Sequence, residues 1–190
     1  MDLEDVDIER DGYYLLKQAI KDGDLDRVKL LVEAGADPDV RDSYGYSHLH
    51  NAAQWGHLEI VKYLHSQGAN INNQDNGLTT PLWLAAYNGN LPLVEYLANN
   101  GADLDNPRAW FGLFPLNAAV AKGHVDVVKF LIEKGADVNK KCEAWGSEYK
   151  ASLSSLESAR IKKREGKMDM IPKYEEIIKL LKDAGAKVII

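Results

Sequence analysis

The sequence predicts an all-α solenoid of about five helix–turn–helix units with short hairpin or turn fingers. A Gly-Ala-Asp triplet, with Asn for Asp in one copy, recurs at intervals of 33, 33 and 34 residues, and a weaker copy follows 50 residues later. A fixed period of this size indicates stacked copies of one small unit. An amphipathic stripe precedes each copy. The copies begin at Gly35, Gly68, Gly101, Gly135 and Gly185.

The segment before each triplet is expected to be the second helix of a unit. In residues 57–70 four apolar residues fall on one helical face. Gly68 then stands just past the helix end, where a left-handed residue is favoured. The same pattern recurs in residues 24–37, 91–103 and 124–137. The four apolar residues of the first example are Leu58, Ile60, Val61 and Leu64.

A shorter helix is expected before each second helix. In residues 80–90, Thr80 suits the N-cap and Pro81 the first helical position. The interval from a leading Leu to a closing Gly is seven residues in this segment and in its equivalents. We therefore expect Leu82, and Val94 of the following helix, to lie in a packed core. The equivalents are residues 14–24, 47–57 and 114–124.

Polar stretches with turn residues separate the units. Residues 39–47 contain Asp42 and Gly45, which is typical of an exposed turn or finger. Gly12, within residues 6–14, stands in register with Gly45 and predicts a finger there too.

The whole chain, residues 1–190, is interpreted as a single domain. Its units are expected at about 9–41, 42–74, 75–107, 108–141 and 142–190, after an acidic tail at 1–8.

The last unit carries a 17-residue excess, which we place near 155–173. We expect a first helix lengthened through about residues 163–164, then a loop broken by Gly166 and Pro172. The insertion either binds a partner or only caps the last hydrophobic face.

These features resemble the ankyrin repeat family. The resemblance rests on Thr80-Pro81-Leu82, on Ala-Ala before a Gly-His pair at 56–57 and 123–124, and on the Gly-Ala-Asp triplets. It is clear over about residues 9–140 and implies an ankyrin-repeat solenoid. Several concordant copies make this signal far more specific than an isolated motif. Departures include Ser47-His48 in place of Thr-Pro and Trp83 at the position of the motif's His.

The sequence offers no arrangement typical of catalysis. His48 and His50 are two residues apart, so on a helix they point to different faces, and we expect no metal site. By the resemblance, His50 ties neighbouring loops and helices. The single cysteine, Cys142, has no motif-linked histidine. No phosphate-binding loop is present. We expect no enzyme activity and no cofactor.

Charge is distributed unevenly along the chain. Residues 1–139 carry a net charge of −10 and residues 140–190 carry +4. This disfavours nucleic acid and favours a basic protein partner; an acidic surface that only keeps the chain soluble is the alternative. No run of 18 apolar residues predicts a membrane span. The acidic N-terminus and lone cysteine fit a cytoplasmic, reducing location, and we expect a monomer.

Aromatic side chains recur at finger positions and near the closing glycines. In proteins of the resembled family, fingers and the exposed side of the first helices form a concave binding face. Exposed Trp and Tyr suit the centre of a protein interface, although some of these rings would instead fill gaps between fingers. The candidate partner-binding residues are Tyr13, Tyr44, Tyr46, Trp55, Tyr87, Asn88, Trp110 and Phe111. The same alignment adds Ser43, Gln54, Asn76, Thr79, Leu113 and Lys122.

The function that the sequence favours is non-catalytic protein–protein recognition through this concave, aromatic, acidic face. The alternative is an inhibitor or antitoxin-type (immunity) protein that masks a basic enzyme, because the first 139 residues are strongly acidic.

Overall fold

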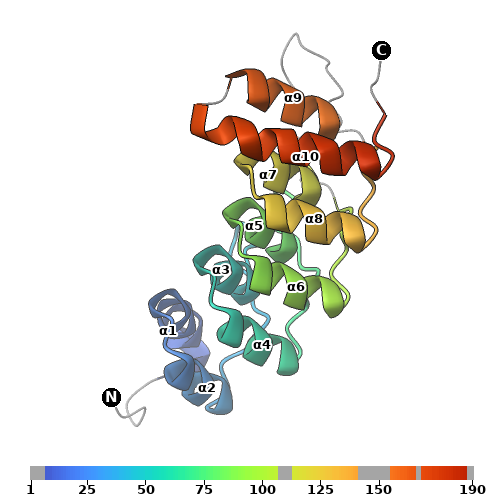
Figure 1. The fold of residues 1–190 in the computed structure, drawn as a ribbon. Helices are drawn as coiled ribbons and strands as arrows, with labels where there is room; N and C mark the ends of the chain where they lie inside the picture. The colour runs from blue at the N-terminus through green and yellow to red at the C-terminus, as the bar shows by residue number, and fades with distance from the viewer. Residues whose placement is uncertain (1–6, 107–112, 141–154, 166–167, 188–190) are drawn as a thin grey trace.

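The computed structural model describes residues 7–106, 113–140, 155–165 and 168–187, and it shows helix pairs stacked along one direction (Figure 1). Within these ranges each second helix follows its first helix closely, as in the predicted unit. The pairs are α1 (Ile8–Asp22) with α2 (Leu25–Glu33), α3 (His48–Trp55) with α4 (Leu58–Ser66), α5 (Pro81–Asn88) with α6 (Leu91–Asn99), α7 (Pro115–Lys122) with α8 (Val125–Glu133), and α9 (Ser155–Glu165) with α10 (Ile171–Asp183), the last pair joined by the 3-10 turn η1 (Met168–Met170).

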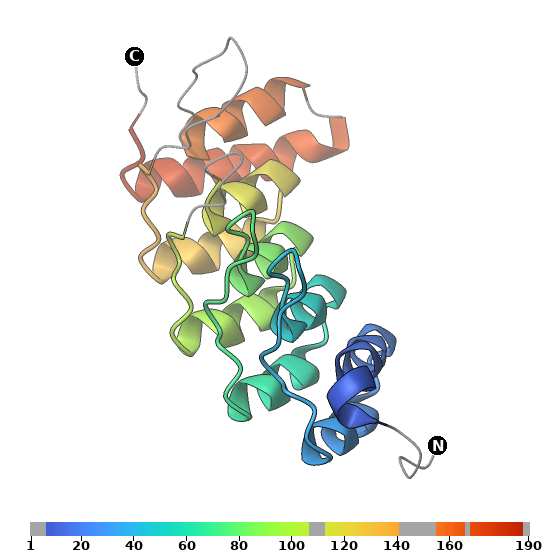
Figure 2. The same cartoon turned by 180° about the vertical axis from the view of Figure 1, so that it is seen from behind.

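The helices form two layers. The first helices α1, α3, α5, α7 and α9 contact one another in chain order, and the second helices form the other layer beside them (Figure 1). The segments that join α2 to α3 and α4 to α5 run along the side seen in Figure 2, where they form the fingers. The expected all-α solenoid of helix–turn–helix units is confirmed.

Local sequence explains where the first helices begin and end. Ser47 Oγ accepts the N–H of His50 at 3.4 Å, and Thr80 Oγ1 accepts the N–H of Trp83 at 3.2 Å, so both residues cap a helix as expected. Pro81 occupies the first turn of α5. The closing glycines adopt the left-handed conformation that ends a helix, for example Gly89 with φ of 72°.

A continuous hydrophobic core joins the units. Leu82 and Val94 are both 0% exposed, which confirms their expected place in the interior. The core extends from Leu16 in α1 to Leu181 in α10, because each helix pair buries its apolar stripe against its neighbours.

A ladder of hydrogen bonds fixes the register of the triplets. Asn72 accepts the N–H of Asp103 at 2.9 Å and donates to the carbonyl of Gly101 at 2.9 Å. Asn139 does the same with Lys187 N at 2.8 Å and the carbonyl of Gly185 at 3.2 Å. The weak Gly-Ala-Lys copy therefore occupies the same structural place as the stronger ones.

The first unit departs from the prediction. Helix α1 already begins at Ile8 and contains Gly12, so the finger expected over residues 6–14 is absent and Tyr13 lies on a helix. A finger shares hydrogen bonds with the finger before it, as Asn76 N does with Tyr44 O. The segment of the first unit instead satisfies its backbone groups by continuing the helix.

The last unit is also rearranged. Helix α9 has 11 residues where α3, α5 and α7 have 8. Pro172 lies in the first turn of α10 rather than in a loop, because a helix start needs no proline N–H. Gly166 lies outside the described residues. The chain from Glu133 to Ser155 is longer than that from Asn99 to Pro115, so part of the excess precedes α9 instead of lying within 155–173.

Candidate functional site

Two fingers, residues 41–47 and 74–80, share one turn geometry. Asp42 Oδ1 accepts the N–H groups of Tyr44 and Tyr46, both at 2.9 Å. Asp75 Oδ1 repeats this pattern with Gly77 at 2.8 Å and Thr79 at 2.7 Å. Each carboxylate thus folds its own finger, which is the local role that Asp favours in turns.

The tips of these two fingers are joined to each other. Asn76 N donates to the carbonyl of Tyr44 at 2.8 Å, and Asn76 Nδ2 donates to the carbonyl of Ser43 at 3.1 Å. Together the two tips form one short ledge beside the first helices. We call this ledge and the exposed side of α1, α3, α5 and α7 the finger face.

Three predicted aromatic residues are exposed on two adjacent units of the finger face. The exposed fraction is 74% for Tyr44 on the first finger, 53% for Trp55 at the end of α3, and 37% for Tyr87 in the last turn of α5. Isolated exposed rings are common, but exposed rings on neighbouring units offer a contact surface to one partner.

The ring of Tyr87 makes two contacts that hold it in place. It stacks on Trp83 with centroids 5.0 Å apart and planes at 19°, and Lys122 Nζ lies 4.2 Å from the Tyr87 centroid. Such a cation–π contact favours one ring orientation. Trp83 is only 4% exposed. The ring of Tyr87 is therefore preorganised on a buried support, which lowers the entropic cost of using it in binding.

Asn88 has a structural partner on the neighbouring unit. Its Nδ2 donates to the carbonyl of Gln54 at 3.0 Å, and the residue remains exposed. This bond links the ends of α3 and α5, the same ends that carry Trp55 and Tyr87.

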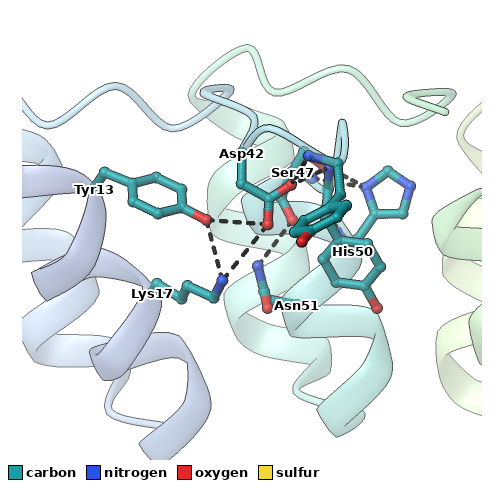
Figure 3. Close-up of polar contacts among 8 residues, drawn as sticks. Tyr13, Lys17, Asp42, Ser47, His50 and Asn51 are labelled. Carbon is teal, nitrogen blue, oxygen red and sulfur yellow. Dashed lines mark hydrogen bonds and ion pairs between the residues drawn. The ribbon is translucent and has the colours of Figure 1, made fainter. Parts of the chain in front are cut away.

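Two other predicted tyrosines serve mainly the fold. Tyr13 is half-buried, donates to Asp42 Oδ2 at 3.5 Å and packs on the His48 ring, with centroids 5.2 Å apart (Figure 3). Lys17 Nζ donates to Tyr13 Oη at 3.2 Å, and this bond, together with Asp42, raises the pKa of Lys17. Tyr46 packs against the core and on the His50 ring, with centroids 4.8 Å apart.

The two predicted histidines of α3 are both fully buried, yet their environments differ. His50 Nδ1 accepts the N–H of Ser47 at 3.1 Å, so Nε2 carries the proton and donates to the carbonyl of Thr79 at 2.8 Å. His50 thus ties α3 to the next finger, as the family resemblance implied. Both ring nitrogens of His48 are without a hydrogen-bond partner. Burial lowers the pKa of both side chains, that of His48 to about 4.

Some predicted positions fall elsewhere. Thr79 is 3% exposed, so it is not part of the accessible face. Its carbonyl and its N–H both form hydrogen bonds within the fold. Trp110 and Phe111 lie outside the described residues. Leu78 was missed: it is 38% exposed and has φ of 54°. Its register with Gly45, a glycine position, is the sequence signal that could have identified it.

The described residues offer little that could support chemistry. No group of three His, Cys, Asp or Glu side chains among them is placed to hold a metal ion. A pocket of about 210 Å³ is lined by Gly89, Gly123, His124, Asp126 and Lys173, among others. His124 Nε2 in this pocket lies 3.0 Å from the carbonyl of Tyr87 and so serves to link units. Over the same ranges, every helix is too short or too polar to pass through a membrane.

Comparison with known proteins identifies the repeats. The family model described as ankyrin repeats (3 copies) matches residues 2–75 and 73–142. A segment of 49 residues is 49% identical to Alpha-latrocrustotoxin-Lt1a of Latrodectus tredecimguttatus; the match covers 22% of this chain, and the chain spans only 4% of the toxin. Ankyrin repeats are generally protein–protein interaction modules and are typically not enzymes. The family model covers well more than half of the chain, and the helix pairs of the structure follow the repeat in the sequence. The chain therefore belongs to the ankyrin repeat family.

Proposed function

We propose that the chain is a non-catalytic module that binds a partner protein through its finger face, the concave, aromatic and acidic surface expected from the sequence. The observation that carries this proposal is the exposure of Tyr44, Trp55 and Tyr87 on two adjacent units. Rigid aromatic rings contribute a large share of binding energy at protein interfaces. The preorganised Tyr87 ring and the unstacked Trp55 ring supply the centre of this surface.

The partner that we propose is basic, and the chain acts on it as a monomer in the cytoplasm. Residues 1–139, which include the fingers and the first helices α1 to α7, carry a net charge of −10. Complementary charge accelerates association and excludes acidic competitors.

The test is capture of a partner from a native lysate on the immobilised chain, followed by measurement of its affinity for defined variants. Trp55→Ala combined with Tyr87→Ala should weaken binding by at least about tenfold, since interface aromatics each contribute roughly 1–2 kcal/mol or more. Leu30→Ala is the matched control, because Leu30 is also exposed, at 47%, but lies on α2 in the second layer. Equal affinity of the double variant and the wild type would place the binding surface elsewhere.

A second candidate function is inhibition of a basic enzyme, as in an antitoxin-type immunity protein, and it rests on the same −10 charge. Both candidates predict that association with a basic partner slows by at least about tenfold between 0.05 M and 0.5 M salt. Turnover of the captured partner separates the two: only an inhibitor abolishes the activity of a basic enzyme on binding. A partner without enzymatic activity, or one whose turnover is unchanged by the chain, would count against the inhibitor.

A further inference from the structure

The second finger contains a leucine in a backbone conformation that favours glycine. Gly45 of the first finger has φ of 75°, and Leu78, at the same position of the second finger, has φ of 54°. Both residues stand three after the finger aspartate and donate a hydrogen bond to its carbonyl, at 2.8 Å and 2.9 Å. Among the described residues, Leu78 is the one that has positive φ without being a glycine.

This conformation is unfavourable for leucine because its Cβ crowds the backbone in the left-handed region. Strain of this kind persists where the side chain brings a compensating benefit, often at a functional position. Packing offers little compensation here, because Leu78 is 38% exposed and is not among the residues that pack against the hydrophobic core. A glycine would fold the finger with less strain, as Gly45 shows.

Leu78 lies on the ledge that the two joined fingertips form. Asn76, two residues before it, bonds to the backbone of Tyr44 and Ser43. The ledge therefore presents two exposed side chains with large apolar surface, Tyr44 at 74% and Leu78 at 38%. The carboxylates of Asp42 and Asp75 lie at the bases of the same fingers.

We propose that Leu78 is a partner-contact residue, held in its strained conformation so that its side chain receives an apolar side chain of the bound partner. This inference rests on the proposed function and extends its surface from the helix ends to the fingertips. The occupant that fits is a protein segment carrying an apolar side chain next to a lysine or arginine. Charge complementarity argues for the basic residue, since the two fingers carry more Asp than Arg and residues 1–139 are strongly acidic.

The experiment first asks whether Leu78 is needed for folding. In the full chain, Leu78→Gly and Leu78→Asn both suit a left-handed position. We expect the midpoint of thermal unfolding to stay unchanged or to rise by about 1–3 °C, since relief of strain offsets the added freedom of the unfolded chain. A midpoint lowered by more than about 3 °C would show that Leu78 is retained for packing and would overturn the proposal.

The second measurement uses peptides as probes. A library of random 12-residue peptides is selected on the immobilised full chain, and the affinity of each enriched peptide is measured by fluorescence anisotropy. The expected peptides carry an apolar residue adjacent to Lys or Arg, lose at least about tenfold in affinity for both Leu78 variants, and bind Leu30→Ala like the wild type. Peptides that lack the basic neighbour would overturn the proposed partner chemistry.

The remaining outcomes separate this inference from the proposed function. Peptides that lose affinity for the Trp55→Ala, Tyr87→Ala double variant but bind both Leu78 variants like the wild type would overturn the role of Leu78 alone. Peptides unaffected by either set of changes, or no enrichment above a blocked surface, would count against the finger face as a whole.

Discussion

The first two junctions between units are held by different kinds of contact, an exposed ion pair in one and a buried hydrogen bond in the other. In the α1–α3 junction, Lys17 reaches the next finger and lies 3.7 Å from Asp42 Oδ2, with its side chain 42% exposed (Figure 3). In the α3–α5 junction, the equivalent residue His50 is fully buried and bonds the carbonyl of Thr79 at 2.8 Å. Solvent screens the first contact and not the second, so equal positions in the repeat do not carry equal energy.

The two junctions also differ at the residue that precedes the leading leucine of each helix, Leu49 in α3 and Leu82 in α5. Pro81 stands there in the α3–α5 junction and has no side-chain polar group to satisfy. His48 stands there in the α1–α3 junction, fully buried and with both nitrogens unpartnered. A buried polar group without a partner is costly. We therefore expect α1 and α2 to be the end of the described solenoid that opens first, since each unit depends on its neighbours.

The largest loss of stability is expected from a cavity at the α3–α5 junction, away from α1 and α2. Leu82→Ala should lower the free energy of unfolding by about 3 kcal/mol, because its side chain is fully buried between helices. Urea denaturation measures this. Leu16→Ala in α1 removes an equally buried side chain, but it should mainly raise the amide-exchange rates of α1. Equal losses of global stability would mean that the first unit is no weaker than the third. Leu30→Ala serves as the exposed control.

The next largest effect is expected from acid. The folded-state pKa of His48 is about 4, against an ordinary value of 6.5, and burial is the main cause. The unfolded chain therefore binds a proton more readily, so the stability that the neutral ring allows is present above pH 6.5 and is lost as the pH falls toward 4. Between pH 7 and pH 5 this amounts to about 2 kcal/mol.

The acid effect is measured as the difference between unfolding free energies at pH 7 and pH 5. Burial and, to a smaller extent, Lys17 disfavour the charged ring, and together they outweigh Asp37 and Asp42, which favour it. His48→Leu should flatten this pH dependence, because it removes the group that takes up the proton. A pH dependence that the variant leaves intact would assign the effect to other groups, His50 first among them.

A smaller loss is expected from the second junction. His50→Ala leaves the carbonyl of Thr79 and the N–H of Ser47 without their partner and should cost about 1–2 kcal/mol at pH 7. Amide exchange in the finger at residues 74–80 reports the loosened contact. Finger exchange rates like those of the wild type would show that the backbone bonds of Asp75 hold the finger without the histidine.

Periodicity was enough to predict the helix pairs and their core, because the same apolar spacing repeats and a closing glycine follows each of the first helices α1, α3, α5 and α7. Leu82, Val94, Ser47 and Thr80 all have their expected structural roles. The ends of the array were less predictable. Gly12 matches a finger glycine in register, yet it lies inside α1, because register does not reveal whether a segment folds into a finger or continues a helix.

The finger face was predicted in outline but not in detail. Sequence register places Tyr44, Trp55 and Tyr87 on the exposed side, and all three are exposed. Register does not reveal that Tyr13 bonds Asp42, because that contact depends on side-chain orientations across units. The stacking of Tyr87 on Trp83 lies within α5, where the two residues are four apart, so helical spacing could have indicated it. Leu78 was missed because an exposed leucine is ordinary by itself; only its register with Gly45 indicates a left-handed backbone position.

The smallest effect is expected from the contact that marks the first junction, Lys17 with Asp42. Lys17→Met keeps most of the stem and removes the charge, so it should change stability by about 0.5 kcal/mol or less at pH 7 and physiological salt. Repeating the measurement in 1 M salt should abolish even this difference, since salt screens an exposed pair. A loss above about 1 kcal/mol that persists in 1 M salt would mean that Lys17 acts by supporting the Tyr13 ring over His48. In that case the two junctions would be similar in strength, and the expected order of opening would reverse or disappear.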